Sequence, residues 1–230
     1  MAAPFSSPAS FRINTPPPPP AAGPNGNVPR RRGRASKISR QQILDAALIE
    51  FAEKGYGGAT TAAIARRLGV TQPLIHYHFG SKEALWHEAV HFLFTQFWTD
   101  MESAFANVRV NGSPETVRDL IRTFVHAMAG HVNVVRIIAN EGYRESPRLA
   151  WLVEEYLRPM FDAALAFLDD ARSGGILSNQ SREHLLFAFL GAATSVFYIG
   201  PTSRELYGLE ANSPENIERQ VELMYRLFVS

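Results

Sequence analysis

The chain has 230 residues, of which 46% are hydrophobic and 20% are charged, so it is long enough and apolar enough for one or two packed domains. It contains no cysteine, which excludes disulfide frameworks, thiolate nucleophiles and cysteine-ligated metal sites. The formal net charge is only +1, but residues 30–82 carry ten Lys and Arg against three acidic residues, whereas residues 83–230 carry twelve against nineteen. This uneven distribution of charge is the first clue to function.

The first 36 residues are rich in proline. Nine of the fifteen prolines lie within residues 1–29. Such a composition buries too little apolar surface to offset the entropy of ordering, so residues 1–36 are expected to form a disordered arm. The segment also lacks the continuous apolar run of a secretory signal, so we expect a cytoplasmic protein. Its last part carries a cluster of four arginines: Arg30, Arg31, Arg32 and Arg34.

From residue 37 onward the apolar spacing is that of α-helices. The predicted N-caps are Ser39, Thr60 or Thr61, Thr71 and Ser81, and the predicted helix-ending glycines are Gly55, Gly69 and Gly80. The fourth helix is expected to run to about residue 105, and further helices are predicted at about 114–130, 131–140, 147–172, 182–199 and 214–228. Residues 185–203 have no formal charge, but the small residues at their centre and the Gly200-Pro201 break favour a buried helix over a membrane span. Because no strong period-two segment is present, the predicted fold class is all-α.

A tight turn between two short helices carries the main functional signal. Residues 62–79 combine a helix, a turn at residues 68–71 and a second helix. Gly69 can adopt the turn conformation that residues with a Cβ resist, and Val70 fills the angle between the helices. The region is basic and follows an arginine cluster, so this helix-turn-helix pattern favours binding to double-stranded DNA. The cations would neutralise phosphates, and a flexible arginine-rich arm can enter a minor groove.

A longer pattern of residues at fixed spacing covers about residues 40–85. It includes Ile43-Leu44 and Ala46-Ala47, then Thr60-Thr61 and Gly69-Val70-Thr71, and finally His76-Tyr77-His78-Phe79-Gly80-Ser81-Lys82. This pattern resembles the DNA-binding domain of the tetracycline-repressor (TetR) family. The resemblance implies a three-helix DNA-binding domain at residues 37–82 and a larger helical effector-binding and dimerisation domain at residues 83–230. It also implies a transcriptional regulator without enzymatic activity, most often a ligand-responsive repressor that binds a palindromic operator as a dimer.

By this resemblance, the helix after Thr71 is the recognition helix. Thr60, Thr61 and Lys82 are implied to bind phosphate. The expected DNA-binding residues are Arg30, Arg31, Arg32, Arg34, Thr60, Thr61, Thr71, Gln72, Pro73, His76, Tyr77 and Lys82. Gln72 is suited to pair with adenine N6 and N7, whereas His76 and Tyr77 can equally contact the DNA backbone. His76 stands where the family usually has Tyr, and Pro73 stands where a small residue is common, although proline is tolerated in a first helical turn.

The resemblance also implies an effector cavity between the helices at about 114–130, 131–140 and 147–172. The expected effector-binding residues are Phe97, Phe124, His126, Met128, Arg136, Asn140, Tyr143 and Trp151. Their mixture of aromatic and polar side chains favours a small organic molecule with an apolar body and one polar or acidic end. The last two helices resemble the family's homodimer interface. The expected contacts there are Leu185, Phe189, Ala192, Val196, Ile217, Val221, Met224 and Phe228.

Two other functions remain open. His87-Glu88-Ala89-Val90-His91 matches the H-E-x-x-H signature of zinc peptidases, in which two histidines hold zinc and the glutamate is the general base. A catalytic zinc also needs a third ligand and a water-holding cleft, so we expect no catalytic residue, no metal site and no cofactor. The other alternative is a sequence-neutral, architectural DNA binder driven by residues 30–34. Such a binder would show no preference for a palindrome and would lose most of its affinity with added salt.

Overall fold

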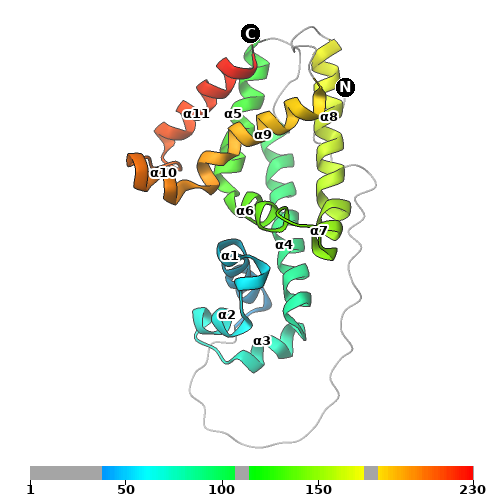
Figure 1. The fold of residues 1–230 in the computed structure, drawn as a ribbon, viewed down its shortest axis with the longest axis vertical. Coiled ribbons are helices and arrows are strands. Elements are labelled where there is room, and N and C mark those ends of the chain that lie inside the picture. Colours follow the sequence, from blue (N-terminus) through cyan, green and yellow to red (C-terminus); the bar gives the residue numbers. More distant parts are fainter. Residues whose placement is uncertain (1–37, 107–113, 174–180, 230) are drawn as a thin grey trace, which may run out of the picture.

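The computed structural model describes residues 38–106, 114–173 and 181–229, and within these ranges every regular element is a helix (Figure 1). The predicted all-α fold class is therefore confirmed. The arm predicted for residues 1–36, with its four arginines at positions 30, 31, 32 and 34, lies outside the described residues.

Three helices and the beginning of a fourth form the N-terminal part of the structure: α1 (Arg40–Gly58), α2 (Thr61–Leu68), α3 (Gln72–Phe79) and α4 (Lys82–Phe105), which continues into the C-terminal part. Ser39, Thr60 and Ser81 each accept a hydrogen bond from the backbone N–H three residues later, whereas Thr71 begins α3 without such a bond. In Figure 1, α1, α2 and α3 lie together at one end of the long helix α4. Apolar side chains from these helices meet in one core: Ile43, Phe51, Ile64, Ile75, Phe79 and Trp86.

The C-terminal part contains the remaining described helices. They are α5 (Pro114–Gly130), α6 (Val132–Glu141), α7 (Pro147–Leu152), the π-helical turn η1 (Val153–Leu157), α8 (Arg158–Ser173), α9 (Arg182–Tyr198), α10 (Gly200–Tyr207) and α11 (Pro214–Phe228). The single helix predicted at about 147–172 is thus divided into α7, η1 and α8.

The sequence does not predict α10. Gly200-Pro201 indicates a break in the chain, yet proline is tolerated in the first turn of a helix, so a new helix begins there and bends by 68° from α9. Over the described ranges, no single helix is both long and apolar enough to cross a membrane. The helices α9 and α10 meet that requirement only together, across their bend.

The two parts of the structure meet where the end of α1 packs against α6. Gly55 interrupts α1 with a φ of +65°, a left-handed conformation that favours glycine. The Nδ2 of Asn140 on α6 donates hydrogen bonds to the carbonyl oxygens of Phe51 (3.4 Å) and Ala52 (3.0 Å) near this interruption. A Cβ on Gly55 would lie 3.8 Å from the Asn140 side chain, an ordinary van der Waals distance. The helix α6 is therefore fastened directly to the first helix of the N-terminal part.

Candidate nucleic-acid interface

The turn between α2 and α3 has the geometry that the sequence predicts. Gly69 has a φ of +66°, and its backbone N–H points back to carbonyls in the last turn of α2. The N–H of Val70 donates to the carbonyl of Ala65 at 2.9 Å. Ile64 of α2 and Ile75 of α3 are both buried in the core. Because the inner faces of the two helices are fixed in this way, the opposite face of α3 points to solvent.

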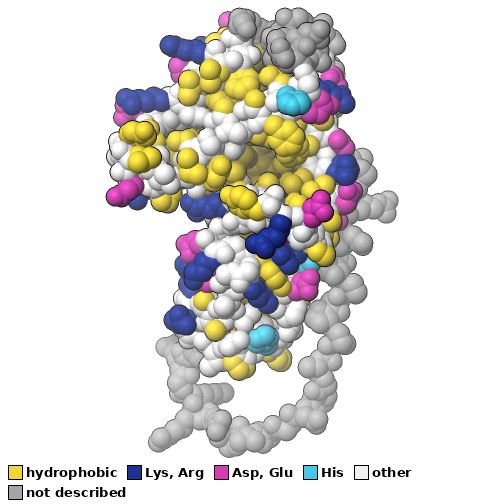
Figure 2. Space-filling view, viewed as in Figure 1, with side chains coloured by type: hydrophobic (Ala, Val, Ile, Leu, Met, Phe, Trp, Pro, Cys, Tyr) yellow, Lys and Arg dark blue, Asp and Glu magenta, His cyan; other side chains and the backbone are white. Residues whose placement is uncertain are grey.

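Four residues predicted to contact DNA lie together on the outer side of α3. Gln72, Pro73, His76 and Tyr77 are all exposed, and 76% of the surface of Tyr77 is accessible. We call these four residues the recognition surface. Thr71, which precedes them, is also exposed. Figure 2 shows Lys and Arg side chains distributed over the end of the molecule formed by α1, α2 and α3, which is the end that carries this exposed helix face.

A polar network orients part of the recognition surface. Gln72 Nε2 donates to Thr61 Oγ1 at 3.0 Å, and His76 Nε2 lies 3.4 Å from Gln72 Nε2. His76 Nδ1 lies 3.2 Å from the carbonyl oxygen of Gly80. A carbonyl only accepts, so Nδ1 carries the proton and the Nε2 of a neutral ring accepts from Gln72. The amide nitrogen of Gln72 is thus held against the protein, and its Oε1 is the group left for a base edge.

The residues predicted to bind phosphate, Thr60, Thr61 and Lys82, differ in their exposure and in their contacts. Thr60 is exposed and caps α2, whereas Thr61 is buried and its hydroxyl bonds to α3. The Nζ of Lys82 lies 4.4 Å from the centre of the Tyr56 ring, and the guanidinium carbon of Arg148 lies 3.8 Å from the centre of the same ring. Burial lowers the pKa of Lys82, and the charge of Arg148 lowers it further. Lys82 is therefore held in place at the start of α4 and is linked through Tyr56 to α7.

The H-E-x-x-H motif lies on α4, and each of its three side chains contacts another helix. Glu88 forms an ion pair with Arg40 of α1, and His91 Nδ1 lies 2.8 Å from the hydroxyl of Tyr156 in η1. The His87 ring packs edge-on against the tryptophan of α7, and burial lowers its pKa. Among the residues that the structure describes, no group of three or more His, Cys, Asp or Glu side chains could hold a metal ion. These contacts within the protomer account for all three side chains.

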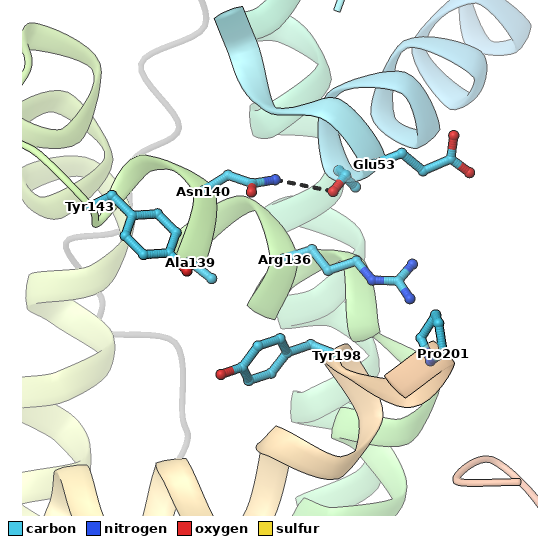
Figure 3. Close-up of a pocket in the computed structure, with 8 residues that line it drawn as sticks. Glu53, Arg136, Ala139, Asn140, Tyr143, Tyr198 and Pro201 are labelled. Atoms are coloured by element: carbon cyan, nitrogen blue, oxygen red, sulfur yellow. Dashed lines mark hydrogen bonds between the residues drawn. The ribbon is translucent and has the colours of Figure 1, made fainter. Parts of the chain in front are cut away.

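A cleft of about 420 Å³ brings three of the predicted effector residues together at the junction of α1 with the C-terminal part (Figure 3). Arg136, Asn140 and Tyr143 line it from α6 or from just beyond its end. The cleft is completed by residues of α1, α6, α9 and α10: Ala52, Glu53, Ala139, Tyr198 and Pro201. The sequence gives no signal for this second group, because these residues are far apart along the chain and no spacing rule connects them.

The other five predicted effector residues lie away from this cleft. Phe97 and Met128 are buried in the core. Phe124, His126 and Trp151 each contact another helix: the ring of Phe124 packs on α9, His126 Nε2 lies 2.7 Å from a carboxylate oxygen on α11, and Trp151 packs on α4. The contacts of these three residues therefore join helices within the C-terminal part.

The predicted dimer contacts fall into two groups. Val221 and Met224 are buried inside the protomer. The remaining predicted contacts are half-buried: Leu185, Phe189, Ala192, Val196, Ile217 and Phe228. The most exposed large apolar side chains on α9 and α11 are ones the sequence did not single out, namely Phe187, Leu223 and Leu227, with exposed fractions of 64%, 50% and 60%. We call these three residues the apolar face, and Figure 2 shows hydrophobic side chains gathered over this region.

A glycine turn between two packed short helices, an exposed recognition surface and the cations at the same end of the molecule define a helix-turn-helix DNA-binding protein. Residues 43–89 match the family model for bacterial regulatory proteins of the tetR family. This part of the chain is therefore a DNA-binding domain of the TetR family, and the protein is a DNA-binding transcriptional regulator, which confirms the resemblance found in its sequence.

Relatives and solved structures extend this similarity along most of the chain. The HTH-type transcriptional regulator RutR of Escherichia coli (strain K12) is 24% identical over 200 residues, which cover 86% of this chain and 92% of RutR. The class D tetracycline repressor of Escherichia coli is 38% identical over 50 residues, which cover 22% of this chain and 23% of the repressor. The TetR-like regulator from Rhodococcus sp. RHA1 has a TM-score of 0.58 at 18% identity and covers 83% of this chain and 96% of its own. FadR from Bacillus subtilis, solved in complex with stearoyl-CoA, has a TM-score of 0.57 at 18% identity, with coverages of 81% and 98%.

Proposed function

We propose that the protein works as a cytoplasmic homodimer that binds a palindromic operator and is released from it by a small organic effector. One observation carries this proposal: the same protomer has an exposed recognition surface on α3 and an exposed apolar face on α9 and α11. Joining two copies through the apolar face around a two-fold axis would present two recognition surfaces to one DNA duplex. Their half-sites would then lie one helical turn, or a multiple of it, apart.

The contacts proposed with DNA divide into base and backbone contacts. Gln72 is the proposed base reader, since its oxygen is the free end of its amide, and an exocyclic amine of adenine or cytosine is its complement. His76, Tyr77 and Thr60 are proposed to contact the sugar-phosphate backbone or the groove edge, and Lys82 to bind a phosphate. The four arginines before α1 are proposed to reach the neighbouring minor groove, as the arms of other three-helix readers do.

The effector is proposed to act by shifting the protein from a DNA-binding conformation to one that does not bind the operator. An effector would favour a dimer whose recognition surfaces no longer match adjacent grooves, and α4 would transmit the change because it begins at Lys82 and continues into the C-terminal part. The structural neighbour solved with stearoyl-CoA supports an organic effector of some kind. Thermodynamic reciprocity requires DNA to weaken effector binding by the same factor by which effector weakens DNA binding.

Titration of the purified protein against DNA from upstream of its own gene, with excess nonspecific competitor at near-physiological salt, tests the proposal. We expect competitor-resistant binding with two protomers, or a multiple of two, per site. Uniformly weak binding that falls steeply with salt on every DNA fragment would instead support the architectural alternative. An odd stoichiometry on a single site would contradict the two-fold arrangement.

Replacing Gln72 by Ala is expected to weaken operator binding by about 1–3 kcal/mol and to relax the preference at one base pair of each half-site. The reason is that Gln72 Oε1 is fixed toward the groove by the bond from its amide nitrogen to Thr61. Binding to a set of operators with single base changes measures both effects. Gln41→Ala is the matched control, because Gln41 is an exposed glutamine on α1 outside the recognition surface. Unchanged base preference in Gln72→Ala would remove Gln72 from base readout.

Replacing Lys82 by Gln is expected to weaken binding to all DNA sequences alike. If Lys82 neutralises one phosphate, the slope of log K against log salt concentration becomes shallower by about one. The salt dependence of operator binding, measured by fluorescence anisotropy, gives this slope. Arg158→Gln is the control: it removes one positive charge at the start of α8, where Arg158 pairs with Glu154, and is expected to leave the slope unchanged. An unaltered slope in Lys82→Gln would mean that Lys82 serves only the contact with Tyr56.

A further inference from the structure

The cleft at the junction of α1 with the C-terminal part, which we call the junction cleft, is lined by two aromatic residues, Tyr143 and Tyr198, and has the cationic Arg136 at one end. Figure 3 shows Arg136 and Tyr143 at opposite ends of the exposed side of α6, with the Tyr198 ring facing α6 from across the cleft. Exposed fractions of 84% for Tyr143 and 37% for Tyr198 leave ring surface available on both residues. A volume of about 420 Å³ is within the range of sites for small organic molecules.

Arg136 supplies the positive charge at one end of the cleft. Among the described residues, no carboxylate forms an ion pair with Arg136, although this arginine is half-buried. Glu53 is the acidic residue that lines the cleft, and its Oε2 is bound by Arg67 at 3.0 Å. Glu50, one turn earlier on α1, is buried and bound by a lysine. A half-buried guanidinium without a counter-ion is suited to accept one from a ligand.

The residues around Arg136 limit the kind of anion that fits. A single guanidinium matches one carboxylate in a two-point hydrogen-bonded pair, whereas a multiply charged group would also meet the negative charge of Glu53. The tyrosines offer flat apolar surfaces that stack on an aromatic ring. The ligand that matches these walls is therefore flat, largely apolar and singly charged.

We propose that this cleft binds a monocyclic aromatic carboxylate, with its carboxylate on Arg136 and its ring against Tyr198. The proposal rests on the effector-responsive function proposed above and deepens it by assigning the site and the chemical class. The ligand would touch α1, α6, α9 and α10 at once. It would also lie beside the hydrogen bonds from Asn140 to the carbonyls of α1. Occupancy would therefore act directly on the helix that supports the recognition surface.

Isothermal titration of the full chain with benzoate, 4-hydroxybenzoate and phenylacetate tests the assignment, and benzamide serves as the uncharged analogue. We expect saturable binding of at least one acid at one molecule per protomer, and binding of benzamide at least about tenfold weaker. Arg136→Gln is expected to lose at least tenfold in affinity for the acid. Arg144→Gln is the matched control, since Arg144 is exposed close to α6 but does not line the cleft. Tyr198→Leu provides a second variant that keeps the charge and removes a ring.

The possible results test the ligand site and the proposed operator binding separately. Failure of all three acids to saturate, equal binding of benzamide, or unchanged affinity in both Arg136→Gln and Tyr198→Leu would overturn the assignment. These titrations contain no DNA, so such a failure leaves the operator proposal intact. Conversely, a chain that binds the acid but no palindromic DNA would retain the cleft and lose the proposed operator. Saturation by the acid without any change in operator affinity would overturn the role of the cleft as the effector site.

Discussion

Replacing Leu227 by Glu is expected to weaken the proposed dimer while each protomer stays folded. Leu227 is 60% exposed in the protomer, so the substitution removes little from the folded chain. In the proposed dimer the same side chain would be covered by apolar residues of the partner subunit, and a buried carboxylate without a counter-ion is costly there. We expect the dimer to weaken by about 2 kcal/mol or more, which corresponds to roughly thirtyfold in the dissociation constant.

Sedimentation equilibrium over a range of concentrations measures this effect, and operator binding should fall with it because two linked recognition surfaces bind far more tightly than one. Ile49→Glu is the matched control: Ile49 is a partly exposed aliphatic residue on α1, outside α9 and α11. We expect Ile49→Glu to remain dimeric. A Leu227→Glu protein that sediments like the unmodified protein at every concentration would show that the dimer forms through another surface.

Local signals in the sequence are sufficient to predict the helices of the N-terminal part. Ser39, Thr60 and Ser81 act as N-caps because their hydroxyls accept from backbone N–H groups a fixed number of residues away. Gly69 ends α2 because it adopts a left-handed conformation. These interactions span four residues or fewer, so spacing along the chain is enough to identify them. The recognition surface follows from the same signals, since burying Ile75 turns the opposite side of α3 outward.

The faces of the later helices cannot be assigned in the same way. The helix α9 is apolar around most of its circumference, so the pattern cannot distinguish the side that packs inside the protomer from the side that remains exposed. Phe187 is exposed on α9, and Leu223 is exposed on α11 next to buried Met224. Which apolar residue points outward is decided by the packing of α5, α9 and α11, which is a tertiary property.

The contacts at the junction between the two parts could not be predicted from the sequence either, because they join residues that meet only after folding. Arg148 Nε on α7 donates to Glu141 Oε2 on α6 at 3.1 Å, and its guanidinium lies over Tyr56 of α1. The Nζ of Lys82, at the start of α4, lies over the same ring. Three helices, α1, α4 and α7, are thus connected through the Tyr56 ring, and Arg148 joins α6 to them through Glu141. Since Lys82 is also the proposed phosphate ligand, a shift of α7 would be transmitted to the DNA-binding end.

Removing Arg148 is therefore expected to destabilise the protein strongly. Arg148→Ala would leave Glu141, which is 5% exposed, as a buried carboxylate without its counter-ion. Losing one member of such a buried pair costs about 3–5 kcal/mol. Urea denaturation measures the change in the free energy of unfolding. Arg158→Ala is the control, because it breaks an exposed pair with Glu154 and should cost less than about 1 kcal/mol.

A second substitution identifies the cause of that loss. If the cost arises from the uncompensated charge of Glu141, then Glu141→Gln in the Arg148→Ala background should recover a large part of the stability, because a buried amide is less costly than a buried carboxylate. If the cost arises instead from the lost contact between Arg148 and Tyr56, the second substitution should recover nothing. Equal losses in Arg148→Ala and Arg158→Ala would contradict both explanations and would mean that the connection between α6 and α7 does not stabilise the fold. Recovery by Glu141→Gln would identify the buried charge pair between Arg148 and Glu141, which joins α7 to α6, as the interaction whose loss destabilises the protein.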